Sequence, residues 1–219
     1  MRVTKYLHSC VLLEEDGHRL LFDPGKFSFI EGRVRPEDFA EVDTVIISHE
    51  HPDHVDVEAL KKIVGFSQAR LIGNAQVVTA LQKEGLNAIT LAEGPQQIGG
   101  FTVQAVAAQH EPILTGELPQ NTAHVVNGRV LNPGDSFNSS LEAFAGIELL
   151  ILPVAAPWLT EPAALDFVRR IQPKQVLPVH DGYAKDFFLK QRYQAFATVL
   201  EQHHIKFHPL MEPGASFTL

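Results

Sequence analysis

Three histidines and an aspartate lie within six residues, in the segment His49-Glu50-His51-Pro52-Asp53-His54. Neutral imidazole nitrogens and carboxylate oxygens are common protein ligands of zinc and similar divalent ions, which they bind at about 2.0–2.2 Å. A turn that is rich in histidine by chance is the alternative. The segment directly follows the apolar stretch 42–47, which is typical of a buried strand. The pattern therefore predicts a metal site just beyond a strand end.

Three further candidate ligands follow other predicted strands. His110 comes after the stretch 101–109, Asp135 after the strand that ends near residue 131, and His180 directly after the stretch 174–179. Ligand sites of α/β sheets collect beyond the carboxyl ends of strands, so we expect these side chains to meet the first segment. Together the candidates are enough for two metal ions: His49, His51, Asp53, His54, His110, Asp135 and His180.

The elements that must position these ligands alternate between strands and helices. We expect strands at residues 3–13 and 18–22, joined by a hairpin around Asp16-Gly17, and at 42–47, 69–72, 148–154, 174–179 and in the terminal region 205–219. A hairpin about Asn127-Gly128 is expected over 123–131, and two or three more strands between 88 and 107. We expect helices at 55–66, 75–84, 139–146, after Thr160 and at 184–204. This mixture favours one α/β domain over residues 1–219, with helices covering two sheet faces. Residues 24–41 and 111–121 stay unassigned, as is typical of binding loops.

Composition argues against several classes of protein. The chain has 219 residues and a formal net charge of −8, which disfavours a general nucleic-acid surface. Cys10 is the only cysteine and is expected to be buried, so no internal disulfide or cysteine-rich metal cluster can form. No apolar stretch reaches the roughly 18 residues needed to span a bilayer, and the first residues do not resemble a signal peptide. We expect a cytoplasmic protein with a small-molecule substrate and no nucleic-acid or membrane partner; a homo-oligomer is compatible with the sequence.

The ordered ligand set resembles the metallo-β-lactamase superfamily of metal-dependent hydrolases. The resemblance runs from LLFDPG (residues 20–25) through PVHD (residues 178–181). Within the superfamily, YLHSCVLLE and IQPKQVLPVH look most like the small cytoplasmic branch that contains ascorbate-6-phosphate lactonase. The resemblance implies a four-layer αββα sandwich with the metals in a groove at one edge. The sequence departs from the family pattern at residues 132–136, which read NPGDS, and at residues 155–158, where a family glycine is missing.

The resemblance also implies roles for the ligands. It assigns His49, His51 and His110 to a first metal, assigns Asp53, His54 and His180 to a second, and makes Asp135 the bridge. Asp23 matches an aspartate that orients the ligand loops. The implied enzyme is a dinuclear hydrolase with two divalent ions, zinc first and manganese or iron as alternatives. With two bound ions the site carries about +1, and a bridging hydroxide would attack an ester, lactone or phosphodiester bond of a small anionic metabolite, with Asp53 helping to orient the water.

Other residues have a functional and a structural interpretation. His124 is a candidate proton donor or substrate contact, and Asp181 a candidate partner of a metal ligand. Candidate substrate contacts, each of which could equally be a structural or surface residue, are His8, Trp158, Arg33 and Arg35. The remaining histidines of the turn, the last long helix and the tail are expected at the surface: His18, His203, His204 and His208.

Two competing functions stay open. A mononuclear iron dioxygenase of the same fold can use a related histidine core with a different ligand subset. Diiron flavoproteins of this fold replace the second histidine of the core by glutamate, whereas His51 is present here. A catalytically silent metal-binding protein is the other alternative, and the complete ligand set argues against it.

Overall fold

Two seven-stranded sheets form the centre of the protein in a computed structural model that describes residues 1–92, 94–114 and 116–219. The first sheet has the order β14-β1-β2-β3-β4-β5-β6, with bounds Ala215–Thr218, Arg2–Lys5, Val11–Glu15, His18–Phe22, Thr44–Ile46, Arg70–Ile72 and Ala88–Ile89. The second has the order β13-β12-β11-β10-β9-β8-β7, with bounds Lys206–Phe207, Gln175–Val179, Leu149–Pro153, Val130–Asn132, Thr122–Val126, Phe101–Ala107 and Pro95–Ile98.

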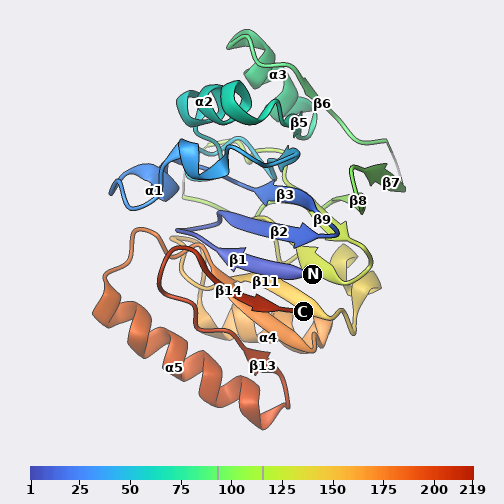
Figure 1. Cartoon of the computed structure of the whole chain (residues 1–219). Helices are drawn as coiled ribbons and strands as arrows, with labels where there is room; N and C mark the ends of the chain where they lie inside the picture. Colours follow the sequence, from blue (N-terminus) through green and yellow to red (C-terminus); the bar gives the residue numbers. More distant parts are fainter. Residues whose placement is uncertain (93, 115) are drawn as a thin grey trace.

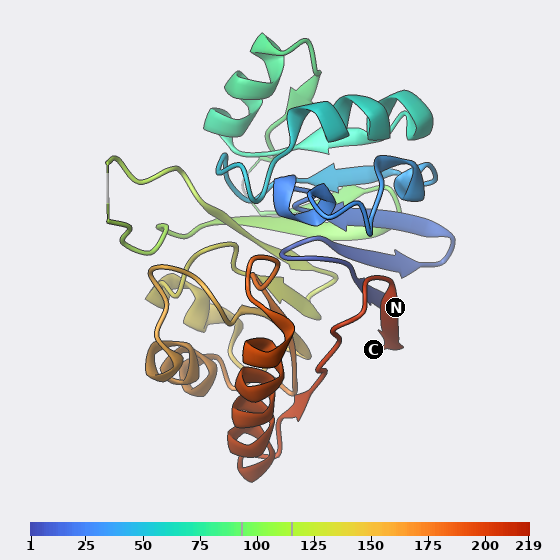
Figure 2. The same cartoon turned by 90° about the vertical axis from the view of Figure 1, so that its left-hand side faces the viewer.

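Helices cover the outer face of each sheet (Figures 1 and 2). The α-helices are α1 (Lys26–Phe29), α2 (Val57–Ser67), α3 (Ala75–Lys83), α4 (Glu161–Ile171) and α5 (Asp186–Gln202), and short 3-10 helices span Pro36–Phe39 and Ser139–Phe144. Leu60 of α2 and Leu81 of α3 pack with Val45 of the first sheet, whereas Phe167 of α4 and Phe196 of α5 belong to the core cluster of the second sheet. The predicted αββα sandwich is therefore confirmed.

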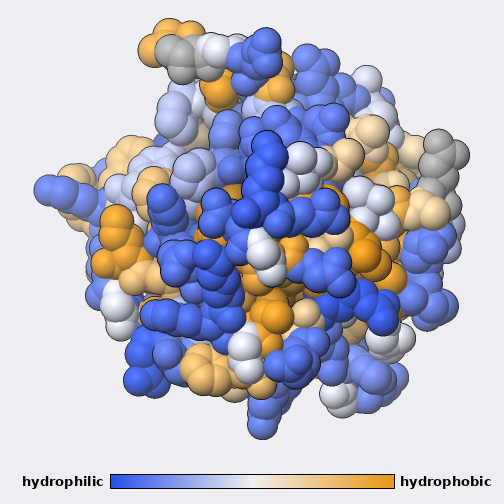
Figure 3. Space-filling view, turned by 90° about the horizontal axis from the view of Figure 1, so that it is seen from above, coloured by the Kyte–Doolittle hydropathy of each residue, from blue (hydrophilic) through white to orange (hydrophobic). Residues whose placement is uncertain are grey.

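Apolar side chains from both sheets fill the space between them. Val3, Leu20 and Ile46 of the first sheet share one buried cluster with Val103 and Leu177 of the second. Burial of apolar area in this layer and the two outer layers is the main stabilising contribution to such a fold. Seen from the side of α2 and α3, hydrophilic residues cover much of the surface, with hydrophobic residues between them (Figure 3). Within the described ranges, no helix is both long and apolar enough to cross a bilayer.

Local sequence signals explain several boundaries. Asp16 and Gly17 both have positive φ, of 51° and 82°, as a two-residue hairpin turn requires. The Asp56 side chain accepts a hydrogen bond from the Ala59 amide at 3.1 Å and caps α2, and Thr160 caps α4 in the same way. The hairpin turn at residues 16–17 and the start of α4 after Thr160 agree with the sequence expectations.

The structure corrects four of those expectations. The expected strand 3–13 is two strands, because residues 6–10 leave the sheet around His8, whose φ is 60°. The segment 24–41 contains α1 and a 3-10 helix, and the helix expected at 139–146 is also of the 3-10 type. His208 is buried, because its ring stacks on Phe217 at 3.5 Å and bonds the Gln175 side chain. The expected loop 111–121 carries no regular element where it is described; Thr115 lies outside the described residues.

Strand direction brings the candidate ligands to one edge. β2 is antiparallel to β1 and to β3, and β4 is parallel to β3, so β1, β3 and β4 end on the same side. In the second sheet β10, β11 and β12 are parallel, and β8 shares their direction because β9 is antiparallel to both β8 and β10. The segments that follow these strands carry all of the candidate ligands.

Candidate metal centre

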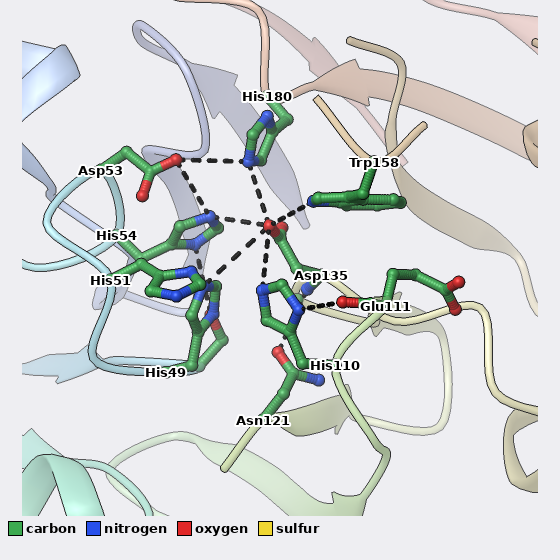
Figure 4. A network of polar contacts seen from close by, with 12 residues as sticks. His49, His51, Asp53, His54, His110, Glu111, Asn121, Asp135, Trp158 and His180 are labelled. Carbon is green, nitrogen blue, oxygen red and sulfur yellow. Dashed lines mark hydrogen bonds and ion pairs between the residues drawn. The ribbon is translucent and has the colours of Figure 1, made fainter. Parts of the chain in front are cut away.

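The predicted ligands converge in two adjoining clusters (Figure 4). One cluster contains His49, His51, His110 and Asp135, and the other contains Asp53, His54 and His180 together with His8; in each, one ligand atom per residue lies within 4.8 Å of the others. Asp135 lies between the two clusters, with its carboxylate oxygens 3.3 Å from His54 Nε2, 3.1 Å from His180 Nε2 and 3.5 Å from His110 Nε2. The structure thus brings all seven candidate ligands together, and the roles that the resemblance implied for them stay predictions.

Hydrogen bonds to backbone carbonyls set the tautomer of His110 and of His180. The Nδ1 atoms of His110 and His180 each lie 2.6 Å from a backbone carbonyl oxygen, of Glu111 and Ala155 respectively. A carbonyl can only accept, so each Nδ1 carries the proton and each Nε2 keeps a free lone pair. Both Nε2 atoms point to the centre of the site (Figure 4).

Ser48 and Asp23 fix the rings of the first histidine segment. Asp23 Oδ2 accepts from His54 Nδ1 at 3.0 Å and from the Ser48 hydroxyl at 2.8 Å, and Asp23 Oδ1 accepts from the Ser48 amide at 2.7 Å. The Ser48 oxygen lies 3.0 Å from His49 Nδ1, which leaves His49 Nε2 facing His51 Nδ1 at 3.1 Å. The buried Asp23 therefore bonds both ends of the segment from Ser48 to His54, and its role in orienting metal ligands stays a prediction.

The free atoms at the centre fit a metal ion. Within the described part of the chain, the Nε2 atoms of His54, His110 and His180 and the Oδ1 atom of Asp135 are buried without a hydrogen bond of good geometry. Buried polar atoms are normally paired, and several unpaired acceptors aimed at one point are what a cation requires. The imidazole and carboxylate donor set suits zinc, manganese or iron.

Carboxylates give this centre a negative potential. Burial lowers the pKa of His180, but Asp135 and Asp53 outweigh it and raise that pKa to about 10. Burial likewise opposes the charged form of His54, yet Asp135 and Asp23 hold its pKa well above the usual range. The field that holds a proton on these rings also attracts a divalent cation, which would replace the proton.

Asn121 and Trp158 hold the Asp135 carboxylate and its loop in place. Asn121 Oδ1 accepts from the Asp135 amide at 3.1 Å, and its Nδ2 donates to the Pro133 carbonyl at 3.0 Å. Gly134 has φ of 58°, and a Cβ atom there would lie 2.2 Å from Asn121 Oδ1, so this turn requires glycine. The Trp158 indole donates to Asp135 Oδ2 at 3.2 Å, which places the side chain against the metal centre.

Asp181 lies behind the site and is held by an ion pair. Its carboxylate is buried and contacts Lys5 Nζ and the Tyr193 hydroxyl. Lys5 Nζ also donates to Tyr193 Oη at 2.7 Å and to the Leu210 carbonyl at 3.1 Å. This group ties the loop after His180 to the end of β1 and to α5.

Three other predicted residues have contacts outside the two clusters. His124 is buried on β9, where its ring lies 6.0 Å from that of Phe22, and burial lowers its pKa to about 4. Arg33 pairs with Glu212 at 2.8 Å, and Arg35 pairs with Asp38 at 3.3 Å. Their proposed contacts with a substrate stay predictions.

Ser48, Asn121, Lys5 and Tyr193 were not among the predicted site residues. Ser48 immediately precedes His49, and this position is the one sequence signal that could have identified it as a site residue. Asn121 lies in a segment without a predicted element, and the partners of Lys5 are 176 and 188 residues away in the chain.

Comparisons with known proteins identify relatives of this chain. A family model described as the beta-lactamase superfamily domain matches residues 2–180. Protein Rv0786c of Mycobacterium tuberculosis is 30% identical over 190 residues, which cover 83% of this chain and 84% of that protein. The UPF0173 metal-dependent hydrolase YtkL of Bacillus subtilis is 27% identical over 221 residues, covering 91% and 93% of the two chains.

Solved structures share the fold at lower identity. Igni18, a metallo hydrolase from Ignicoccus hospitalis, has a TM-score of 0.72 and 21% identity, covering 100% of this chain and 98% of its own. A possible metal-dependent hydrolase from Veillonella parvula has a TM-score of 0.77 and 15% identity, covering 100% and 99%. With the ligand clusters in place and a family model matching most of the chain, this protein belongs to the beta-lactamase superfamily, as a metal-dependent hydrolase.

Proposed function

We propose that this metal-dependent hydrolase holds two divalent ions and cleaves an ester, lactone or phosphodiester bond of a small anionic metabolite. The observation that carries the proposal is the position of Asp135, whose carboxylate contacts histidines of both clusters while Oδ1 has no hydrogen bond among the described residues. Two ions bound there would supply an activated water at neutral pH and positive charge for the developing oxyanion. We propose zinc as the native metal, with manganese and iron also compatible with the donor set.

Residues beside the proposed ions would orient the water and contact the substrate. Asp53 is the ligand carboxylate with the larger exposed fraction, 19% against 2% for Asp135, so it can accept a hydrogen bond from an attacking water. Trp158 is partly buried beside Asp135 and can line the site that receives the substrate. A screen of metal-loaded protein against a lactone, a thioester and a phosphodiester tests the function, and hydrolysis of none of these bond types would contradict it.

Metal content is the first testable prediction. Protein purified without chelators is expected to carry about two divalent ions per chain, because the seven candidate ligands lie in two clusters. Elemental analysis and titration with zinc or manganese measure the stoichiometry. Saturation at one tightly bound ion would instead favour the mononuclear iron enzyme, which ultraviolet-visible spectroscopy of the iron-loaded protein would identify.

Charge selectivity is the second prediction. A site with two ions, two aspartates and a hydroxide carries about +1, so it should prefer a substrate with a carboxylate or phosphate group. Because Arg33 and Arg35 already pair with acidic side chains, the bound ions are the proposed source of this preference. The test compares kcat/KM for a neutral and an anionic version of one ester, and equal or better turnover of the neutral ester would refute it.

Three finer expectations stay predictions. They are the membership of the branch that contains ascorbate-6-phosphate lactonase, the cytoplasmic location, and a small-molecule substrate without nucleic-acid or membrane partners. A lactone phosphate is the most direct probe for the first of these, because it joins the expected bond type and the expected charge in one molecule.

A further inference from the structure

His8 contacts the second cluster at three points. Its Nε2 atom lies 3.1 Å from Asp53 Oδ2, its Nδ1 atom accepts from the Gly182 amide at 3.1 Å, and its carbonyl oxygen accepts from the His180 amide at 3.1 Å. The side chain is fully buried, and its ring lies 4.2 Å from the His180 ring. One residue between β1 and β2 thus joins the two loops that supply Asp53 and His180.

The hydrogen-bond pattern of His8 differs from that of the candidate ligands His110 and His180. The Gly182 amide can only donate, so Nδ1 of His8 has to accept and the proton of the neutral ring is on Nε2. In His110 and His180 the proton is on Nδ1 and Nε2 is free. His8 therefore presents an N–H group to Asp53 where the ligands present a lone pair, although its ring nitrogen lies close enough to belong to the cluster.

The backbone around His8 is built for this contact. His8 has φ of 60° and His180 has φ of 64°, a left-handed conformation that is uncommon for residues other than glycine. A Cβ atom on Gly182 would lie 2.9 Å from His8 Cβ, so the two loops can approach this closely only because residue 182 is glycine. Such outliers persist where the surrounding contacts hold them, and they concentrate at functional sites.

We propose that His8 is a positioning residue, which donates its Nε2–H to Asp53 and holds the Asp53 and His180 loops at the spacing that the second metal ion requires. It is neither a metal ligand nor a substrate contact, since both ring nitrogens are engaged within the protein. The inference rests on the proposed two-ion site for its effect on metal binding, whereas the hydrogen bond can be tested by itself. Mutation of a partner that orients a metal ligand in this way typically lowers the metal affinity by about 10–100-fold.

Two substitutions separate the two side-chain contacts. His8→Asn keeps an acceptor near the Nδ1 position for the Gly182 amide and tolerates the left-handed backbone, but it cannot reach Asp53. His8→Gln places an amide N–H near the Nε2 position for Asp53, but it loses the Gly182 contact and tolerates this backbone poorly. We expect His8→Asn to keep its melting temperature near that of the wild type and to bind the second ion about 10–100-fold more weakly. His8→Gln should lose thermal stability and keep the second ion within a few fold.

A purely structural role predicts a different pattern, in which metal affinity follows stability and His8→Gln is the weaker binder. Stepwise zinc titration by calorimetry, with melting curves of the metal-free variants, distinguishes the two patterns. A His8→Asn variant that binds both ions as tightly as the wild type would overturn the proposal.

Imidazole nitrogen shifts in 15N-labelled protein test the hydrogen bond directly. We expect His8 to have a protonated Nε2 and an unprotonated Nδ1, both before and after zinc is added. A metal-bound Nε2 would make His8 a ligand, and a proton on Nδ1 would remove the contact with Gly182; either result contradicts the inference. If the wild type binds a single ion, the two-ion function fails, but the nitrogen shifts still decide whether His8 donates to Asp53.

Discussion

Asp135→Asn is expected to lower turnover by at least about 10³-fold while the fold persists, a loss comparable to removing a main electrostatic stabiliser. The Asp135 carboxylate is 2% exposed and faces His54, His110 and His180 at 3.1–3.5 Å. The amide of asparagine keeps the shape but removes the negative charge that both ions would share. Metal stoichiometry should therefore fall towards one ion per chain. Steady-state kinetics and elemental analysis of the same preparation measure both effects.

The alternative interpretation makes Asp135 a turn residue after Pro133 and Gly134, where an aspartate commonly bonds its neighbouring backbone. An asparagine would then serve equally well, and the variant would retain both its ions and its activity. Asp166→Asn is a matched control, because it removes one carboxylate charge from the exposed face of α4, where Asp166 pairs with Arg170. A result for Asp135→Asn that matches this control would remove the bridging role.

The convergence of the candidate ligands could be predicted because it depends on local rules. The candidate ligands follow β4, β10 and β12, which have parallel neighbours, and β8, which shares the direction of β10 because both are antiparallel to β9. Strands that run in the same direction end at the same edge of a sheet, so His110, Asp135 and His180 were expected near the histidine segment. The sandwich followed from the alternation of strands and helices together with the family resemblance. The caps at Asp56 and Thr160 depend on contacts within four residues and were predictable for the same reason.

Contacts between distant segments were not predictable in this way. Residues 3–13 have a continuous β pattern, yet the chain leaves the sheet at residues 6–10 because His8 bonds Asp53 and Gly182, which are 45 and 174 residues away. The terminal region 205–219 forms strands, as the sequence predicts, and the sequence does not indicate which sheet each one joins. β13 joins the second sheet and β14 pairs with β1 of the first. Hydrophobic periodicity specifies that a strand is present and does not specify its partner.

Lys5→Met is expected to lower the free energy of unfolding by about 3–5 kcal/mol, the usual effect of removing one partner of a buried ion pair. The Lys5 side chain is 3% exposed and that of Asp181 is 5% exposed, so neither charge can be solvated when its partner is lost. Methionine has a similar volume and keeps the apolar contacts of the lysine stem, which isolates the loss of charge. Denaturant unfolding of metal-free protein measures the effect without a contribution from bound ions.

The proposed cause of this lower stability is the buried Asp181 carboxylate left without its partner, rather than lost packing. A second substitution tests this. In Lys5→Met/Asp181→Asn the carboxylate charge is gone, and the asparagine carbonyl can still accept from the Tyr193 hydroxyl, so the double variant should be more stable than Lys5→Met alone. Lys61→Met is the surface control: Lys61 pairs with Glu58 and Glu84 in solvent, where an ion pair contributes little, so its unfolding curve should stay near that of the wild type. If the double variant is as unstable as Lys5→Met, or if Lys5→Met unfolds like the surface control, the ion pair does not stabilise the loop that carries His180.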